Sequence, residues 1–120
     1  MDYLILKTIH LTGLAMTFMG LAGVLASKVA SEAPFKKRWI FHVSHGVGML
    51  MLVFSGFALA HQLGALNSIP GWLRGKFVIW LLAGGAMALA IRFSRFTGLV
   101  LIFFAGLVLA AAWLSIQKPF

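Results

Sequence analysis

Residues 96–116 read FTGLVLIFFAGLVLAAAWLSI and contain no charged side chain. A run of about 20 apolar residues has the length that an α-helix needs to cross the hydrocarbon core of a bilayer. In lipid, every backbone N–H and C=O group needs a partner within the chain, and a helix supplies those partners. This stretch therefore predicts a transmembrane helix.

Three upstream segments have the same character. Apolar residues dominate approximately residues 3–26, 40–63 and 73–91, and each segment again has close to the ~20 residues of a spanning helix. The first segment has too long an apolar run for a cleaved signal peptide, so we expect it to stay in the mature fold. Because short connections make consecutive helices antiparallel neighbours, we expect one all-α domain over residues 1–120, a polytopic, up-down-up-down four-helix transmembrane bundle.

The composition of the whole chain supports a membrane protein. Hydrophobic residues make up 62% of the sequence, whereas soluble domains are roughly 45–50% apolar. The formal net charge is +8, which in a lipid-embedded chain predicts contact with anionic headgroups and not with nucleic acid. Cysteine is absent, which excludes disulfides, thiolate metal sites and covalently attached haem. Any metal or haem must therefore be held by histidine, methionine, lysine or oxygen.

Basic residues are unequally divided between the two sides of the predicted bundle. Six follow the first and third helices and four lie on the other side: Lys28, Lys36, Lys37, Arg38, Arg92 and Arg95, against Lys7, Arg74, Lys76 and Lys118. Because cytoplasmic loops are enriched in lysine and arginine, we expect both termini to be periplasmic in a bacterial inner (cytoplasmic) membrane.

The histidines are the candidate functional residues. An ionisable side chain at membrane depth is costly unless it lines a cavity, pairs with a partner or binds a cofactor. Histidine is also the common axial ligand of haem iron. The chain contains four histidines, all in its first half: His10, His42, His45 and His61.

His10 is the first candidate metal ligand. It recurs with Gly13 and Gly20 at helical spacing, which places all three on one face of the first helix. Small residues beside a donor leave room for a macrocycle, so we expect Gly13 and Gly20 to flank a haem that His10 ligates. In an antiparallel bundle, His61 and Lys76 fall at the same outer level as His10. That level predicts one cofactor site, although a lysine near a helix end ordinarily extends to water.

His45 is the second candidate metal ligand. His42 and His45 are three residues apart and project similarly, so at most one of them can be an axial ligand in a single site. The other would hydrogen-bond a propionate, a quinone carbonyl or a lipid phosphate, or lie in the headgroup layer. His61 follows His45 by about 24 Å along the helix axis, which places these two histidines in different sites.

Other chemistries are less well supported by the sequence. Asp2 and Glu32 are the acidic residues of the chain, and both fall at helix margins, which excludes a paired-carboxylate hydrolase site. Methionine sulfur could hold copper, but we favour apolar packing for these side chains. The methionines concerned are Met16, Met19, Met49 and Met51.

Two short segments carry a family resemblance. Residues 6–11, LKTIHL, contain Lys-x-x-His, and residues 71–76, GWLRGK, contain Trp-Leu-x-x-Lys. These patterns resemble those of small four-helix bacterial membrane proteins that include the HemJ-type protoporphyrinogen oxidases, the SirB-like proteins and the copper-resistance D-type domains. The resemblance implies b-type haem, with His10 matching the helix-one histidine and Lys76 matching the helix-three lysine as ligand or site residue.

We therefore expect a b-type haem-binding membrane protein that transfers electrons through histidine axial ligation. We expect one haem b near His10. The sequence leaves open whether His45 or His42 holds a second haem, and whether a quinone or quinol is a partner. The alternatives are a porphyrinogen oxidase of the HemJ type and a non-catalytic accessory or assembly subunit of a larger membrane complex. Because the bundle is thin around a macrocycle, we expect a homodimer or a subunit of such a complex.

Overall fold

The computed structural model describes residues 2–30 and 38–118, and within them it contains helices and no strand. Four long helices and one short 3₁₀ helix follow in the order α1 (Tyr3–Ala30), α2 (Arg38–Gln62), α3 (Gly71–Arg92), η1 (Ser94–Phe96) and α4 (Thr97–Gln117). The expectation of an all-α chain with four long apolar helices is confirmed. The expectations for Glu32, Lys36 and Lys37 lie outside the described residues.

Each of the four long helices is long and apolar enough to cross a membrane. Their outward faces carry large apolar side chains, such as Phe54 with 71% of its surface exposed and Ile116 with 76%. In water, contiguous apolar surface of this kind would drive association. In lipid it faces a solvent of its own polarity, as expected for a multi-pass membrane protein.

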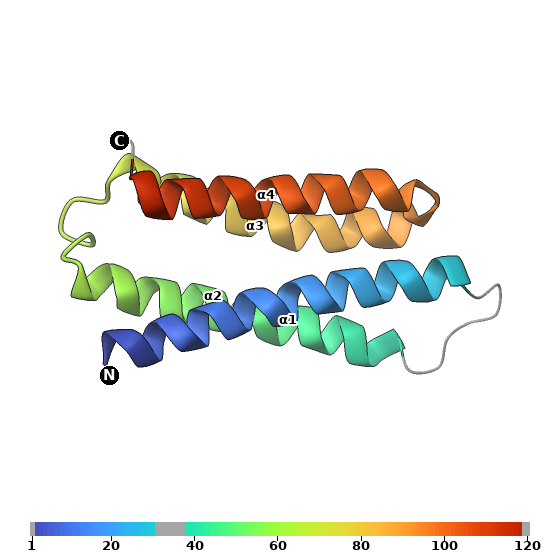
Figure 1. Ribbon diagram of the computed structural model, residues 1–120, viewed down its shortest axis with the longest axis horizontal. Helices are drawn as coiled ribbons and strands as arrows, with labels where there is room; N and C mark the ends of the chain where they lie inside the picture. The colour runs from blue at the N-terminus through green and yellow to red at the C-terminus, as the bar shows by residue number, and fades with distance from the viewer. Residues whose placement is uncertain (1, 31–37, 119–120) are drawn as a thin grey trace.

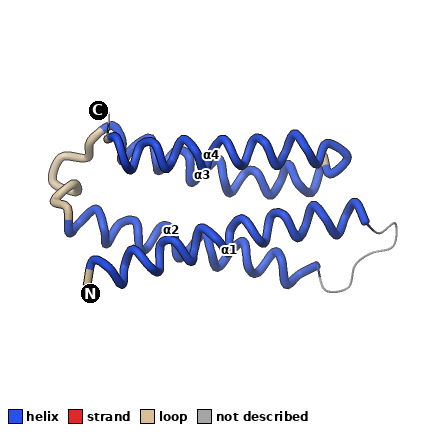
Figure 2. The backbone as a smooth tube through the Cα atoms, viewed as in Figure 1, coloured by secondary structure: helices blue, strands red, loops and turns tan. Residues whose placement is uncertain are grey.

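The helices form two pairs (Figures 1 and 2). Helix α1 lies against α2 and α3 lies against α4, with the α1–α2 pair in the more extensive contact. The start of α1, the connection over residues 63–70 and the end of α4 lie together at one end of the molecule, which we call the terminal end. The η1 turn lies at the other, the η1 end. We refer below to the terminal half and the η1 half of the bundle.

Glycines allow α1 and α2 to approach backbone to backbone. A Cβ atom placed on Gly48 would lie 2.5 Å from the backbone nitrogen of Thr17, and one placed on Gly20 would collide with the backbone of Phe41. Gly13 meets the same helix through Gly48 and Met51. The open space that we expected beside Gly13 and Gly20 is thus filled by α2. These glycines serve close helix packing, because small residues are what allows such an approach in membranes.

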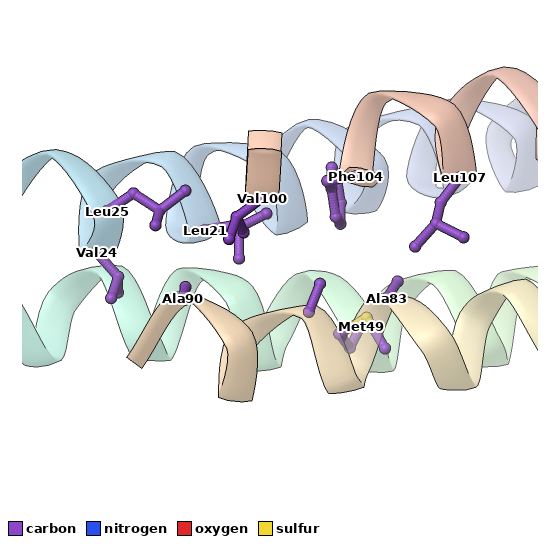
Figure 3. Packing of buried hydrophobic residues seen from close by; sticks show 10 residues of the cluster. Leu21, Val24, Leu25, Met49, Ala83, Ala90, Val100, Phe104 and Leu107 are labelled. Carbon is purple, nitrogen blue, oxygen red and sulfur yellow. The ribbon is translucent and has the colours of Figure 1, made fainter. Parts of the chain in front are cut away.

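The two pairs are joined by a packed core that lies mainly in the η1 half and draws side chains from all four helices (Figure 3). The small alanines on α3 leave space in which the larger side chains of α1 and α4 pack between the helices. At mid-height the indole Nε1 of Trp80 donates to the carbonyl of Met49 over 2.9 Å, which ties α3 to α2. The buried residues are Leu21, Val24, Leu25, Met49, Ala83, Ala86, Ala90, Val100, Phe104 and Leu107.

Candidate functional site

His10 is held by a serine of the neighbouring helix. Its Nδ1 lies 2.8 Å from Oγ of Ser55, and the same hydroxyl donates to the backbone carbonyl of Met51. A hydroxyl has one hydrogen to donate. Because Ser55 gives that hydrogen to Met51, Nδ1 of His10 must carry a hydrogen and donate it to Ser55. A neutral imidazole in this tautomer keeps its lone pair on Nε2, the form in which histidine binds metal.

The side chain of His10 is half-buried. It bonds to Ser55 through Nδ1, and the backbone carbonyl of Leu52 also acts on the ring. A Cβ atom placed on Gly56 would have only the His10 ring within 4 Å, at 3.5 Å from Cε1. Gly56, rather than Gly13 or Gly20, is therefore the glycine that leaves room beside the candidate ligand.

Lys76 is a half-buried cation close to this histidine. The side chains of His10 and Lys76 lie near enough to interact electrostatically, and Lys7 and Lys118 lie similarly near Lys76. Within the part of the chain that the structure describes, Asp2 is the acidic residue. No carboxylate there acts electrostatically on Lys76. A half-buried charge without a counter-charge is unfavourable, so this position favours an anionic ligand.

Aromatic rings partly compensate the two neighbouring lysines. Nζ of Lys7 lies 5.6 Å from the centre of the Tyr3 ring, and Nζ of Lys118 lies 5.3 Å from the centre of the Trp72 ring. Both distances suit a cation–π interaction. Lys76 has no such ring contact among the described residues, which makes it the least compensated of the three.

His45 shares the tautomer of His10 but not its surroundings. Its Nδ1 lies 3.0 Å from the carbonyl oxygen of Thr17, which can only accept, so Nδ1 carries the hydrogen. Its Nε2 is the single buried side-chain nitrogen or oxygen in the described ranges that has no hydrogen-bond partner. With 5% of its surface exposed, and with the Gly20 backbone packed against its own, His45 is enclosed.

The other two histidines lie apart from His10. His42 is half-buried in the first turns of α2, one turn from His45 and close enough to interact with it electrostatically. His61 is in the last turn of α2 at the terminal end, and its side chain is exposed. The structure thus brings His10 and Lys76 together as expected, whereas His61 faces outward.

An apolar groove of about 330 Å³ runs between α1 and α2 beside the Ser55–His10 pair. Phe54 and Leu50 in its lining are largely exposed, so the groove opens toward the apolar outer surface. Ser55 is its polar residue and also the partner of His10. The lining residues are Leu6, Ile9, Val47, Leu50, Met51, Phe54 and Ser55.

Sequence reasoning did not identify Ser55 or the role of Gly56. The available signal is a serine within an apolar segment. Because helical serines usually bond to their own backbone, this signal does not predict a partner on another helix. The pairing of His10 with Ser55 depends on the register between α1 and α2. That register is fixed by the glycine contacts and not by local sequence.

The donors do not converge on a bare metal ion. Within the described ranges, no group of three or more His, Cys, Asp or Glu side chains is placed to hold one. Met49 belongs to the packed core, and Met19 is 57% exposed, as packing and lipid-facing residues would be. A haem needs only one or two axial donors from the protein, and a donor set of His10 with Lys76 nearby fits that smaller requirement.

Comparison of the chain with protein-family models, curated proteins and solved structures finds no match.

Proposed function

We propose that this protein binds haem b in the terminal half of the bundle through Nε2 of His10 and transfers electrons within a bacterial inner membrane. The four apolar helices support an up-down-up-down arrangement across the bilayer. Basic residues near the η1 end support a cytoplasmic location for that end and periplasmic termini, by the positive-inside rule. These residues are Lys28, Arg38, Arg92 and Arg95.

The observation that carries the proposal is that His10 has the tautomer in which histidine binds metal and lies close to Lys76. Within the described residues, no carboxylate acts on this half-buried lysine. Ser55 holds Nδ1–H of His10, which leaves Nε2 free for iron, and Gly56 leaves space beside the ring. Lys76 then either pairs with a propionate carboxylate or supplies a second nitrogen donor. Haem, when bound, contributes a one-electron couple whose potential depends on axial ligation and burial.

One haem fits the geometry better than two. His45 also exposes a lone pair on Nε2, but it lies in the η1 half, where Leu21, Ala86 and Phe104 are almost completely buried. A macrocycle beside His45 would have to displace this core. We therefore propose that the redox partner, a quinol or a protein, exchanges electrons with a single haem near the periplasmic side.

The groove favours electron transfer over porphyrinogen oxidation. A tetrapyrrole substrate carries carboxylates that need cationic partners, and the groove beside Ser55 is lined by apolar residues and one serine. The HemJ-type alternative requires a second cationic cleft next to the haem. A non-catalytic subunit of a larger complex is the alternative if the protein binds no haem.

The test is the absorption spectrum of the detergent-purified full chain, with haem counted by the pyridine haemochrome assay. We expect a reduced b-type spectrum and about one haem per chain. A matched pair of variants, His10→Asn and His45→Asn, keeps a side-chain N–H near the Nδ1 position and removes Nε2 at each site.

We expect His10→Asn to lose haem and His45→Asn to retain it. A colourless wild-type protein from haem-replete cells would contradict the proposal and leave the accessory-subunit role. Normal haem content in His10→Asn would remove His10 as the ligand. Loss of haem in His45→Asn alone would move the site to the η1 half.

A further inference from the structure

Ser55 makes a contact that its helix does not require. A serine inside a helix commonly donates to the carbonyl four residues earlier, and Ser115 shows this behaviour, with Oγ 2.9 Å from the carbonyl of Ala111. Ser55 makes the equivalent bond to Met51 and, in addition, accepts Nδ1–H of His10 from another helix. Apart from a longer 3.4 Å contact of Ser55 Oγ with the Leu52 carbonyl, the two serines differ by the bond to the histidine.

The position of Ser55 makes this interaction well defined. The side chain has 3% of its surface exposed, and close glycine contacts over residues 41–52 of α2 fix the register of α1 and α2 directly before it. Because water is excluded, Nδ1–H of His10 depends on acceptors within the protein. The backbone carbonyl of Leu52 also accepts a hydrogen bond from the ring. Ser55 is therefore the principal acceptor, and Leu52 is a second one.

We propose that Ser55 is a positioning residue for His10: it fixes the Nδ1–H tautomer and the ring orientation, and thereby sets how strongly Nε2 binds iron. This inference rests on the proposed haem function. In metal sites generally, the group that accepts the second N–H of a ligand histidine orients the ring and raises its donor strength, and its removal typically weakens metal binding by about 10–100-fold.

The first measurement needs no haem. In ¹⁵N-histidine-labelled full-length protein purified without added haem, the ¹⁵N shifts report which ring nitrogen carries the hydrogen, and His10→Asn identifies the His10 signals. We expect wild-type His10 to show a protonated Nδ1 and an unprotonated Nε2. In Ser55→Ala we expect a mixture of tautomers, because the Leu52 carbonyl retains part of the Nδ1–H form. Ser115→Ala is the matched control and should leave the His10 signals unchanged.

The second measurement is haem titration of wild type, Ser55→Ala and Ser115→Ala. Ser55→Ala should weaken haem binding about 10–100-fold and shift the reduction potential of the bound haem, whereas Ser115→Ala should match wild type in both. Thermal unfolding of the haem-free proteins checks that the two alanine variants are equally well folded. A merely structural serine would change unfolding without changing the tautomer.

The outcomes separate this inference from the haem proposal. If Ser55→Ala and Ser115→Ala show the same His10 tautomer and the same haem affinity, the positioning role is wrong even though haem binds. If wild type binds no haem, the haem proposal fails and with it the effect of Ser55 on iron binding, and the ¹⁵N data then show only whether Ser55 sets the tautomer of His10. A shifted tautomer with unchanged haem affinity would also overturn the proposal, because the tautomer would then not govern ligation.

Discussion

The terminal and η1 halves of the bundle each hold one histidine with the same tautomer, in opposite surroundings. His10 in the terminal half donates Nδ1–H to Ser55 and has space beside its Cε1 atom at Gly56, with a half-buried lysine close by. His45 in the η1 half donates to the carbonyl of Thr17 and is enclosed by packed helices. The tautomer that can bind metal thus occurs in both halves. Among the described residues, the terminal half adds space beside the ring and a half-buried lysine on which no carboxylate acts.

The packing of the two halves explains the difference. In the η1 half, alanines on α3 face leucine, valine and phenylalanine side chains from α1 and α4, and the helices close on one another (Figure 3). In the terminal half, Lys7 and Lys118 both lie near enough to act electrostatically on the half-buried Lys76. Like charges disfavour close approach unless an anion lies between them. The proposed ligand site therefore lies in the terminal half, whereas the packed core of the fold lies mainly in the η1 half.

The largest expected effect tests the packed half. Phe104 has 1% of its surface exposed and contacts Phe18, with ring centres 5.6 Å apart. Removing a buried phenylalanine leaves a cavity, so we expect Phe104→Ala to lower the free energy of unfolding by about 3–5 kcal/mol. Phe103→Ala, at a neighbouring position that is 40% exposed, should lose much less. Unfolding in mixed detergent and SDS micelles measures both, and equal losses would show that the η1 half is not the stabilising core.

The second prediction tests the glycine contact that sets the α1–α2 register. In Gly48→Ala the new Cβ would lie 2.5 Å from backbone and side-chain atoms of Thr17, so the helices must separate, and overpacking of this kind lowers stability by about 1–3 kcal/mol. Gly46→Ala is the control on the same helix, because a Cβ there meets nothing within 4 Å. The same unfolding assay applies. Equal stability of the two variants would contradict the close approach of the helices.

The third prediction tests the charge in the terminal half. Lys76→Met removes a half-buried cation, so we expect haem affinity to fall about tenfold, equivalent to ~1.4 kcal/mol, as a pairing with propionate or a second ligand is lost. Haem-free stability should rise or stay equal, because repulsion from Lys7 and Lys118 is relieved. Arg74→Met, at an exposed position of the same helix, is the control. Haem titration showing equal affinities for the two variants would remove Lys76 from the site.

The smallest expected effect tests the link between the two helix pairs. Trp80→Phe removes the indole bond to the Met49 carbonyl and keeps an aromatic ring beside Phe77. We expect a loss of about 0.5–1.5 kcal/mol in unfolding, the usual contribution of one hydrogen bond. Trp113→Phe, at a position that is 50% exposed, should be close to neutral. A loss as large as that of Phe104→Ala would mean that this link, and not the core, joins the pairs.

Much of the fold could be predicted from the sequence. The apolar segments predicted four long helices, and the observed helices differ from the expected bounds only at their ends, most at α1, which continues to Ala30. Among the site residues, His10 and Lys76 could be placed at one level, because antiparallel neighbours bring the start of α1 and the start of α3 to the same end. Their proximity in the structure agrees with that expectation.

The interpretation of the glycines shows where local sequence was insufficient. Gly13 and Gly20 share a helix face with His10, and helical spacing cannot say whether such a face meets a cofactor or another helix. In the structure, this helix face packs against α2, and the space beside the His10 ring lies at Gly56 instead. The role of Ser55 was equally inaccessible, because it depends on a partner 45 positions away in the chain.

By itself, the sequence determined that this chain forms apolar helices of membrane-spanning length, because the hydropathy of about 20 consecutive residues is a local property. It also determined which ionisable groups the helices must carry. The tertiary structure decided which of these groups meet: His10 with Ser55 and Lys76 in an open half, His45 with Thr17 in a closed one. The physical reason is that helices in lipid associate through close packing of small residues and not through hydrophobic burial. The register that no single helix encodes is therefore set by glycines that approach the other helix too closely for a Cβ atom, and by bonds between helices such as that of His45 to Thr17.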